Sequence, residues 1–237
     1  MFVGNGGLEM YVRITSRCNM KCAHCCYSCG PRGRDMSLET FKKAATLSKD
    51  KGEGLFLGGG EPLLHPQFWE ILGLALGSCA DDVWVGLITN GKVKDRALAV
   101  AGLARRGALY AGLSRDQWHE DISPEVVKAF TRDAKRAVSR DDPNDMRDIR
   151  DGETVYPVGR GVEVATDDEG CVCPDLLVEP DGTVWGCGCR KTKVGTVDGL
   201  DLPAWYDDAD YERGECFEKN KAKAEADVEY QKEEVAA

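Results

Sequence analysis

The N-terminal part of this 237-residue chain contains the segment Arg13-Ile-Thr-Ser-Arg-Cys18-Asn-Met-Lys-Cys22-Ala-His-Cys25. An apolar, strand-like run over residues 9–15 leads into three cysteines with the spacing CxxxCxxC. Thiolates bind soft metals, and three of them on one short loop suit an iron–sulfur cluster. A [4Fe–4S] cube has four iron corners, so three cysteines leave one iron open to a ligand from outside the protein. The same spacing is also compatible with a zinc site or with buried thiols.

Two further motifs stand at the ends of the next two apolar runs. The first is Leu55-Phe-Leu-Gly58-Gly59-Gly60-Glu61-Pro62, a short buried strand that enters a glycine loop, and the second is Ile88-Thr89-Asn90-Gly91. Together with the cysteine triad, they resemble the signature of the radical S-adenosylmethionine (SAM) enzymes. In that superfamily a CxxxCxxC loop follows the first strand, a Gly-Gly-Glu-Pro loop follows the second and, often, a Thr-Asn-Gly turn follows the third.

The resemblance implies both the cofactors and the residues that hold them. It implies a [4Fe–4S] cluster on Cys18, Cys22 and Cys25, with SAM bound at the open iron. The SAM-binding residues that it implies are Gly58, Gly59, Gly60, Glu61, Pro62 and Asn90. Glycine has no Cβ, so its backbone can approach a ligand closely. One electron from an external donor of the flavodoxin or ferredoxin type would then cleave a carbon–sulfur bond of SAM to give a 5′-deoxyadenosyl radical.

A second set of cysteines, Cys22, Cys26 and Cys29, also has the spacing CxxxCxxC. We favour the first set because the superfamily places a Cys-Asn pair shortly after the first strand, as Cys18-Asn19 does here. The superfamily also prefers a ring-bearing residue just before the third cysteine. His24 fills that place in the first set, whereas Ser28 would fill it in the second. Cys26 and Cys29 are then interpreted as packing thiols.

Composition narrows the class of protein. The formal charge of −10, from 41 acidic against 31 basic residues, argues against a large nucleic-acid-binding surface. The sequence has no apolar run long enough to span a membrane, and no secretory leader opens it. Eleven cysteines are an odd number and cannot all be paired in disulfides. These features predict a protein of the reducing cytoplasm with metal sites and without a membrane partner.

Strand-like and helix-like segments alternate, which is typical of parallel βα units. We expect strands at residues 9–15, 54–57, 83–89 and 109–114, and helices at 38–51, 66–79, 93–106 and from Ser123-Pro124 onward. Residues 1–160 are therefore predicted to be an α/β domain, a partial (β/α) barrel of parallel strands like the radical SAM core. The polar segment 139–152 predicts a loop and residues 154–158 one further strand. Since the superfamily usually has six strands, we expect an abbreviated barrel or one without its fifth strand.

Ser114 and Asp116 follow the fourth predicted strand. Polar residues at the carboxyl ends of parallel strands face the mouth of a barrel. The two resemble a Ser-x-Asp pair of the superfamily, which implies that they contact SAM, with Ser114 at the ribose. His119 and Glu120 resemble a His-Glu pair of some members, but a helix-entry motif with an exposed histidine explains them equally well.

The C-terminal part carries a second group of cysteines. Cys171-Val-Cys173 and Cys187-Gly-Cys189 flank residues 176–185, in which two strand-like runs surround Asp181-Gly182, a strong hairpin signal. Residues two apart on a strand share a face, so each pair can point both sulfurs the same way. Four thiolates suit a zinc ion as well as an iron–sulfur cluster.

Within the resemblance, the spacing of Cys171, Gly182 and Cys187 is similar to the opening of the auxiliary-cluster domains called SPASM and, in shortened form, Twitch. It implies that residues 161–237 form a small domain of β-hairpin and helix with one auxiliary iron–sulfur cluster, interpreted as [4Fe–4S]. Cys171 and Cys187 are the firmer ligands, while Cys173, Cys189 and Cys216 compete for the other places. The charged end of the chain predicts a solvated helix to which we assign no chemistry.

Two hypotheses for the function follow. The first is a radical SAM enzyme that acts on a peptide or a small molecule. The second is a cysteine-rich iron–sulfur or zinc module for electron transfer or interaction, without catalysis. Glu61 and the three-part SAM signature favour the first. Analogy at the level of the fold cannot choose the substrate.

Overall fold

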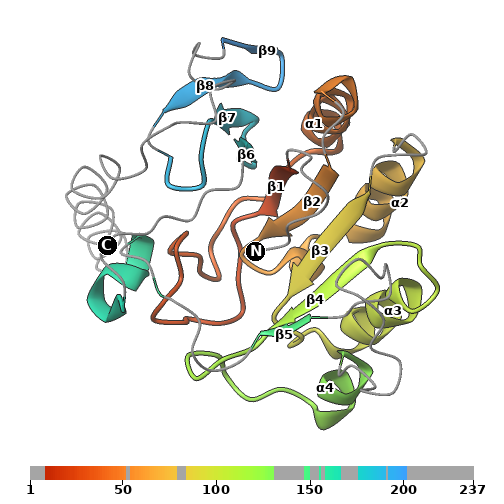
Figure 1. The fold of residues 1–237 in the computed structure, drawn as a ribbon, viewed down its shortest axis with the longest axis vertical. Helices are drawn as coiled ribbons and strands as arrows, with labels where there is room; N and C mark the ends of the chain where they lie inside the picture. Colours follow the sequence, from red (N-terminus) through yellow and green to blue (C-terminus); the bar gives the residue numbers. More distant parts are fainter. Residues whose placement is uncertain are drawn as a thin grey trace.

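The computed structural model describes residues 9–51, 54–78, 84–130, 147–149, 155, 158–166, 176–190 and 192–201. Its centre is one open sheet of nine strands in the order β5-β4-β3-β2-β1-β6-β7-β8-β9. Strands β1 to β6 pair in parallel, and β7 to β9 add to the sheet in antiparallel fashion. Figure 1 shows helices α1 to α4 along one side of the sheet and the loop that follows β1 on the other side.

The bounds of the elements agree closely with the sequence pattern over the first 130 residues. The parallel strands are β1 (Glu9–Thr15), β2 (Gly54–Gly59), β3 (Val85–Thr89), β4 (Tyr110–Ser114), β5 (Arg147–Ile149) and β6 (Leu176–Val178). The α-helices are α1 (Leu38–Lys51), α2 (Phe68–Ser78), α3 (Lys94–Ala104) and α4 (Pro124–Phe130). The remaining elements are the 3₁₀ helices η1 (Pro62–Leu64) and η3 (Gly159–Val164) and the strands β7 (Thr183–Trp185), β8 (Lys193–Thr196) and β9 (Gly199–Leu200). The α/β class and the first four predicted strands are thus confirmed.

Strand β1 shows how the sequence pattern positions side chains on the two faces of the sheet. Met10, Val12 and Ile14 are fully buried and belong to the main hydrophobic core, which they share with residues of the helices. Because successive side chains of a strand point to opposite faces, Arg13 and Thr15 point to the other face. Both are buried as well. A buried arginine in a strand of this kind calls for charged or polar partners.

A row of aromatic rings crosses the sheet near the amino ends of its strands. The ring centroids of Tyr11 and Phe56 are 5.6 Å apart, those of Phe56 and Trp84 are 6.2 Å apart, and those of Trp84 and Tyr110 are 5.4 Å apart. These rings come from four successive segments of the sheet. They pack β1 to β4 together, while the carboxyl ends of the strands carry the polar motifs.

The fifth strand corrects the sequence-based expectation. Residues 139–152 were expected to be a loop, but β5 lies within them and pairs in parallel with β4. A three-residue edge strand is held by backbone hydrogen bonds to its neighbour, so its sequence, Arg-Asp-Ile, carries no apolar run that would reveal it. The strand expected at residues 154–158 is wrong at Val155 and Val158, which are not in a strand, and its other residues lie outside the described ones.

The predicted hairpin is present and joins the main sheet. Leu177 pairs with Trp185 and Val178 with Val184, across a turn in which Gly182 has a φ of +85°. Such a φ favours glycine. Strand β6 also pairs in parallel with β1, so the hairpin continues the sheet beyond its first strand. The domain boundary at residue 160 stays a prediction.

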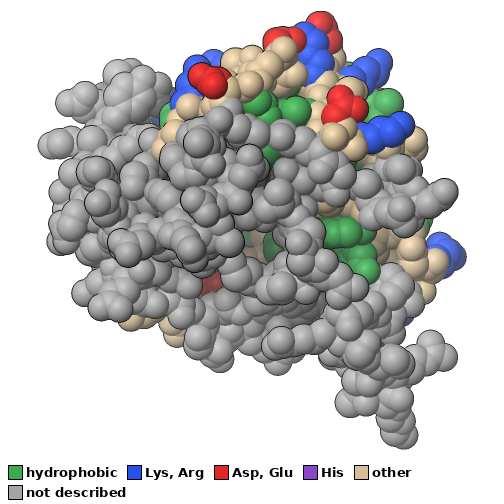
Figure 2. Space-filling model, turned by 45° about the horizontal axis from the view of Figure 1, so that its top comes forward, with side chains coloured by type: hydrophobic (Ala, Val, Ile, Leu, Met, Phe, Trp, Pro, Cys, Tyr) green, Lys and Arg blue, Asp and Glu red, His purple; other side chains and the backbone are tan. Residues whose placement is uncertain are grey.

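The described surface mixes charges of both signs. On the face shown in Figure 2, the Lys and Arg side chains are interspersed with Asp and Glu side chains around smaller apolar areas. Among the helices that the structure describes, none combines the length and the apolar character that crossing a membrane requires.

Candidate active site

The three cysteines lie on a loop of residues 16–35, here called the cysteine loop, whose two ends are tied together. The backbone N–H of Ser16 donates to the carbonyl of Arg34 at 2.8 Å, and that of Cys18 donates to the carbonyl of Gly30 at 2.7 Å. Arg17 forms an ion pair with Asp35 at 2.8 Å. The loop therefore has a fixed base although it contains neither a helix nor a strand of the main sheet.

The structure brings the predicted cluster ligands together. Cys18 is 8% exposed and forms a small buried cluster with Met20 and Cys29, against which Cys22 and Cys25 pack. Burial raises the pKa of the Cys18 thiol to about 11, so the free thiol stays protonated until a metal displaces its proton. Three thiols on one loop are a donor set that fits an iron–sulfur cluster. Because Cys29 lies beside them, the choice of Cys18, Cys22 and Cys25 over the second set stays a prediction.

The glycine loop after β2 is built against the cysteine loop. The N–H of Gly60 donates to the carbonyl of Thr15, and the N–H of Glu61 donates to the carbonyl of Arg17, both at 2.8 Å. A Cβ on Gly60 would lie 2.2 Å from the Arg17 carbonyl oxygen and 3.1 Å from the Cβ of Cys18. Gly59 has a φ of +137°, and its Cβ would lie 2.1 Å from the carbonyl oxygen of Thr15. Only glycine fits at these two positions.

Glu61 connects the glycine loop to the turn after β3. Its side chain is fully buried and accepts hydrogen bonds from the Thr89 hydroxyl at 2.8 Å, the Asn90 N–H at 2.7 Å and the Leu63 N–H at 3.0 Å. Burial raises the pKa of this carboxyl to about 7, although the hydrogen bonds favour its ionised form. Pro62 follows at the start of η1, for which Glu61 is the N-cap.

Asn90 extends this connection to the cysteine loop. Its side-chain amide donates to the oxygen of the Asn19 side chain at 3.0 Å and lies 3.7 Å from the sulfur of Cys18. Lys92, two residues later, donates to the carbonyl of Asn19 at 3.0 Å and pairs with Glu120. The two motifs predicted from sequence therefore meet the cysteine triad at the carboxyl ends of β1, β2 and β3.

Ser114, Asp116 and His119 form one group after β4. His119 lies 2.8 Å from Asp116 and 3.3 Å from the Ser114 hydroxyl, and His24 of the cysteine loop lies 3.2 Å from the other oxygen of Asp116. Burial disfavours the charged imidazole of His119, but hydrogen bonds with Asp116 and Cys22 outweigh it and raise the pKa to about 9. The side chain of His119 is thus 8% exposed and paired with Asp116, rather than free at the surface.

Arg160 contacts the cysteine loop, although it was not among the predicted site residues. From η3, its N–H donates to the carbonyl of Cys25 at 3.0 Å, and its guanidinium donates to the carbonyls of Cys22 at 3.1 Å and Cys29 at 2.9 Å. Gly159 allows this approach, because its Cβ would lie 2.5 Å from the Cys26 carbonyl oxygen. The sequence feature that could have pointed to Arg160 is its place in a Gly-Arg-Gly turn that follows a long polar segment.

The structure describes only part of the second cysteine group. Cys187 is 9% exposed and Cys189 is 4% exposed, and both follow β7. Cys171, Cys173 and Cys216 lie outside the described residues. Their role as ligands of an auxiliary cluster stays a prediction.

Comparison with known proteins agrees with this geometry. The family model of the radical SAM superfamily matches residues 12–141, which is more than half of the chain. The chain belongs to the radical SAM superfamily. This membership favours the hypothesis of an enzyme over that of a module without catalysis.

Two known proteins are similar to about half of this chain. The chain is 38% identical over 133 residues to GTP 3′,8-cyclase of Chlorobaculum tepidum, covering 52% of this chain and 40% of that protein. It is 31% identical over 117 residues to the antilisterial bacteriocin subtilosin biosynthesis protein AlbA of Bacillus subtilis, covering 48% of this chain and 25% of that protein. The chain thus spans less than half the length of these two relatives.

The fold also resembles that of BtrN in complex with AdoMet and 2-DOIA, with a TM-score of 0.58 at 14% identity over 92% of this chain and 87% of that one. At this identity the likeness concerns the fold alone.

Proposed function

We propose that this enzyme cleaves SAM reductively and uses the resulting 5′-deoxyadenosyl radical to abstract a hydrogen atom from a peptide or a small molecule. The observation that carries the proposal is the meeting of three motifs at one place. The glycine loop forms backbone hydrogen bonds with the cysteine loop. The Glu61 carboxylate accepts a hydrogen bond from the N–H of Asn90 in the turn after β3, and the side-chain amide of Asn90 in turn contacts the sulfur of Cys18. No single motif has this specificity.

The residues present fit the cofactors. Cys18, Cys22 and Cys25 would hold the [4Fe–4S] cluster, which when bound supplies the electron that breaks the carbon–sulfur bond of SAM. The absence of Cβ atoms at Gly59 and Gly60 keeps the glycine loop against the cysteine loop, where its backbone can bind the methionyl part of SAM. Gly58, Pro62, Ser114 and Asp116 complete the proposed SAM site.

The chain's own groups position the cysteines. Arg160 binds three carbonyls of the cysteine loop, and each bond restricts the path of the backbone between the sulfurs. Asp116 orients His24 and His119, which lie next to Cys25 and Cys22.

The proposal also includes an auxiliary iron–sulfur cluster and an external electron donor. Cys187 and Cys189, with Cys171, Cys173 or Cys216, would bind an auxiliary iron–sulfur cluster that assists the reaction. A protein of the flavodoxin or ferredoxin type would deliver the electron. The relatives named above include a cyclase of the nucleotide GTP and a protein of bacteriocin biosynthesis.

Cleavage of SAM can be measured without the true substrate. Anaerobically reconstituted and reduced protein should convert SAM to 5′-deoxyadenosine and methionine, detected by liquid chromatography. Cys18→Ala should lower the yield to background, since the cluster loses a ligand, whereas the matched variant Cys29→Ala should keep it. An active Cys18→Ala with an inactive Cys29→Ala would assign the cluster to the second set of cysteines. Wild-type protein that binds four irons but yields no 5′-deoxyadenosine would refute the proposed activity.

A further inference from the structure

The sulfur of Cys18 lies among groups that donate hydrogen bonds. The backbone N–H of Met20 donates to it at 3.4 Å, and the side-chain amide nitrogen of Asn90 donates to it at 3.7 Å. Sulfur is larger than oxygen, so its hydrogen bonds are correspondingly longer. A metal-bound thiolate carries no proton and can only accept hydrogen bonds. Two N–H donors therefore suit a sulfur that is a ligand of the cluster.

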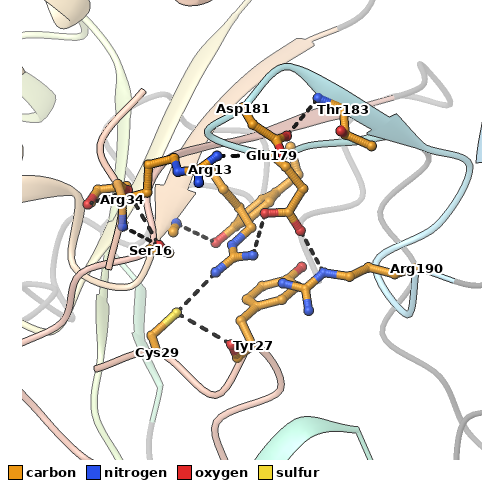
Figure 3. A network of polar contacts seen from close by, with 12 residues as sticks. Arg13, Ser16, Tyr27, Cys29, Arg34, Glu179, Asp181, Thr183 and Arg190 are labelled. Carbon is orange, nitrogen blue, oxygen red and sulfur yellow. Dashed lines mark hydrogen bonds and ion pairs between the residues drawn. The ribbon is translucent and has the colours of Figure 1, made fainter. Parts of the chain in front are cut away.

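The sulfur of Cys29, which belongs to the second set of cysteines, is bonded differently (Figure 3). It accepts a hydrogen bond from Nη2 of Arg13 at 3.1 Å, and its S–H donates to the carbonyl oxygen of Tyr27 at 3.8 Å. A sulfur that donates as well as accepts is a protonated thiol. The contrast between the two sulfurs favours Cys18 as the ligand.

The amide of Asn90 is held with its nitrogen toward Cys18. Its oxygen accepts a hydrogen bond from the backbone N–H of Lys92 at 3.0 Å, which identifies the other end of the amide as the nitrogen. That nitrogen also donates to the side-chain oxygen of Asn19 at 3.0 Å. The backbone of Asn90 is held as well, because its N–H donates to Glu61 at 2.7 Å. These contacts direct one N–H of the amide at the sulfur.

We propose that Asn90 donates a hydrogen bond to the sulfur of Cys18 in the loaded enzyme and thereby raises the reduction potential of the cluster, in place of the contact with SAM that the resemblance implies. The amide has two hydrogens, and Asn19 and Cys18 accept both. Asn90 is 6% exposed, so little of its surface is left for a ligand to contact. The inference rests on the proposed function, since it needs a cluster on Cys18.

A hydrogen bond to a ligand sulfur favours the reduced form of a cluster. On reduction the cube gains one electron from the external donor, and the sulfurs carry part of the added negative charge. An N–H group directed at a ligand sulfur stabilises this charge, so the reduction potential rises. Removing the donor should therefore make the cluster harder to reduce while its three cysteine ligands stay in place.

The test is a redox titration of the anaerobically reconstituted full chain with dithionite, without SAM, followed by electron paramagnetic resonance. Asn90→Leu keeps the approximate size of the side chain and removes the donor. At a fixed potential the ratio of reduced to oxidised cluster should fall roughly threefold to tenfold, the range for one hydrogen bond, and tenfold corresponds to a midpoint about 59 mV more negative. The affinity for SAM, from isothermal titration, should stay that of the wild type.

Asn19→Leu is the matched control. It removes a hydrogen bond from the same loop but no donor to a sulfur, so its midpoint potential should equal that of the wild type. The inference fails if Asn90→Leu keeps both its iron and the wild-type potential, or if Asn19→Leu shifts the potential as much. It also fails if Asn90→Leu keeps the potential but binds SAM more weakly, because Asn90 would then be a ligand of SAM.

A second variant covers the case in which Asn90→Leu holds no iron. Asn90→Asp has the size of the wild-type side chain and lacks the N–H donor, so its potential should also be more negative, and an unchanged potential would overturn the inference. Loss of iron from both variants would overturn it too, because Asn90 would then hold the cluster in place rather than set its potential. A chain that cleaves SAM while its Asn90 variants keep the wild-type potential would refute this inference alone. A chain whose potential shifts in Asn90→Leu but which does not cleave SAM would refute the proposed activity alone.

Discussion

The cysteine loop and the C-terminal hairpin both carry cysteines at metal-binding spacing, but the chain holds them in different ways. The cysteine loop has no regular element of its own, yet backbone bonds from Gly60, Glu61 and Arg160 fix it from two distant parts of the sequence. The hairpin has regular strands and continues the sheet from β1, while its described cysteines, Cys187 and Cys189, follow the end of β7. The regular strands therefore form the scaffold, whereas the proposed site lies on an irregular loop that contacts from several segments hold in place.

The largest expected effect is on the iron content of the protein, which tests whether both regions bind a cluster. If both regions hold a cube, reconstituted protein should contain about eight irons per chain, and replacing Cys18, Cys22 and Cys25 together by Ala should leave about four, on the assumption of [4Fe–4S] at each site. Cys187→Ala should remove the other four and keep those of the cysteine loop. The measurement is iron and zinc analysis of anaerobically purified protein.

The opposite outcome is equally informative. A triple variant that contains one zinc and no iron would show that the hairpin binds a structural ion, and the auxiliary cluster would be rejected. Loss of all iron in Cys187→Ala would show instead that the two regions depend on each other. In either case the hairpin would not be an independent redox site.

A glycine substitution tests the packing of the cysteine loop at a smaller scale. Gly60→Ala places a Cβ 2.2 Å from the backbone oxygen of Arg17, and backbone atoms cannot move aside cheaply. We expect a loss of about 1–3 kcal/mol in the free energy of unfolding, the usual cost of overpacking. Gly73→Ala in α2 is the matched control, because its Cβ would meet no atom within 4 Å.

The control should change stability in the other direction. Alanine in the interior of a helix is favoured over glycine by about 0.5–1 kcal/mol, so Gly73→Ala should raise the free energy of unfolding in urea. Equal effects of the two variants would mean that a Cβ at position 60 is accommodated, and that close packing of the glycine loop against the cysteine loop does not require glycine there.

The sequence predicted those features that local pattern encodes. Alternating apolar residues in β1 and the glycines and cysteines at strand ends sufficed to place the first four strands and the three SAM motifs. Strand β5 was not predicted, because its pairing with β4 is made by backbone groups and leaves no pattern in the side chains. The link from Arg13 to Glu179 joins residues 166 positions apart, so no window of sequence shows it. Its one local signal was an arginine inside an apolar strand.

The pH dependence of stability tests the contribution of one side chain, the buried carboxyl of Glu61 that joins two motifs of the site. Burial raises the pKa of Glu61 from 4.5 to about 7. The folded state then holds the proton more tightly than the unfolded state, so the stabilisation is complete below pH 4.5 and is lost as the pH rises through about 7. The free energy of unfolding of the wild type, relative to Glu61→Gln, should fall by about 2–3 kcal/mol between pH 5 and 8.

Glutamine is the reference because it does not titrate, so other ionisable groups cancel in the difference. Urea unfolding of metal-free, reduced protein at several pH values gives the two curves. Glu39→Gln is the matched control for loss of a carboxylate at the surface, since the side chain of Glu39 on α1 is 82% exposed. If the Glu61→Gln curve runs parallel to that of the wild type, Glu61 is as ionised in the folded chain as in the unfolded one. Its three hydrogen bonds would then fully offset its burial, and the link between the glycine loop and Asn90 would rest on a carboxylate that is charged at every pH of the test.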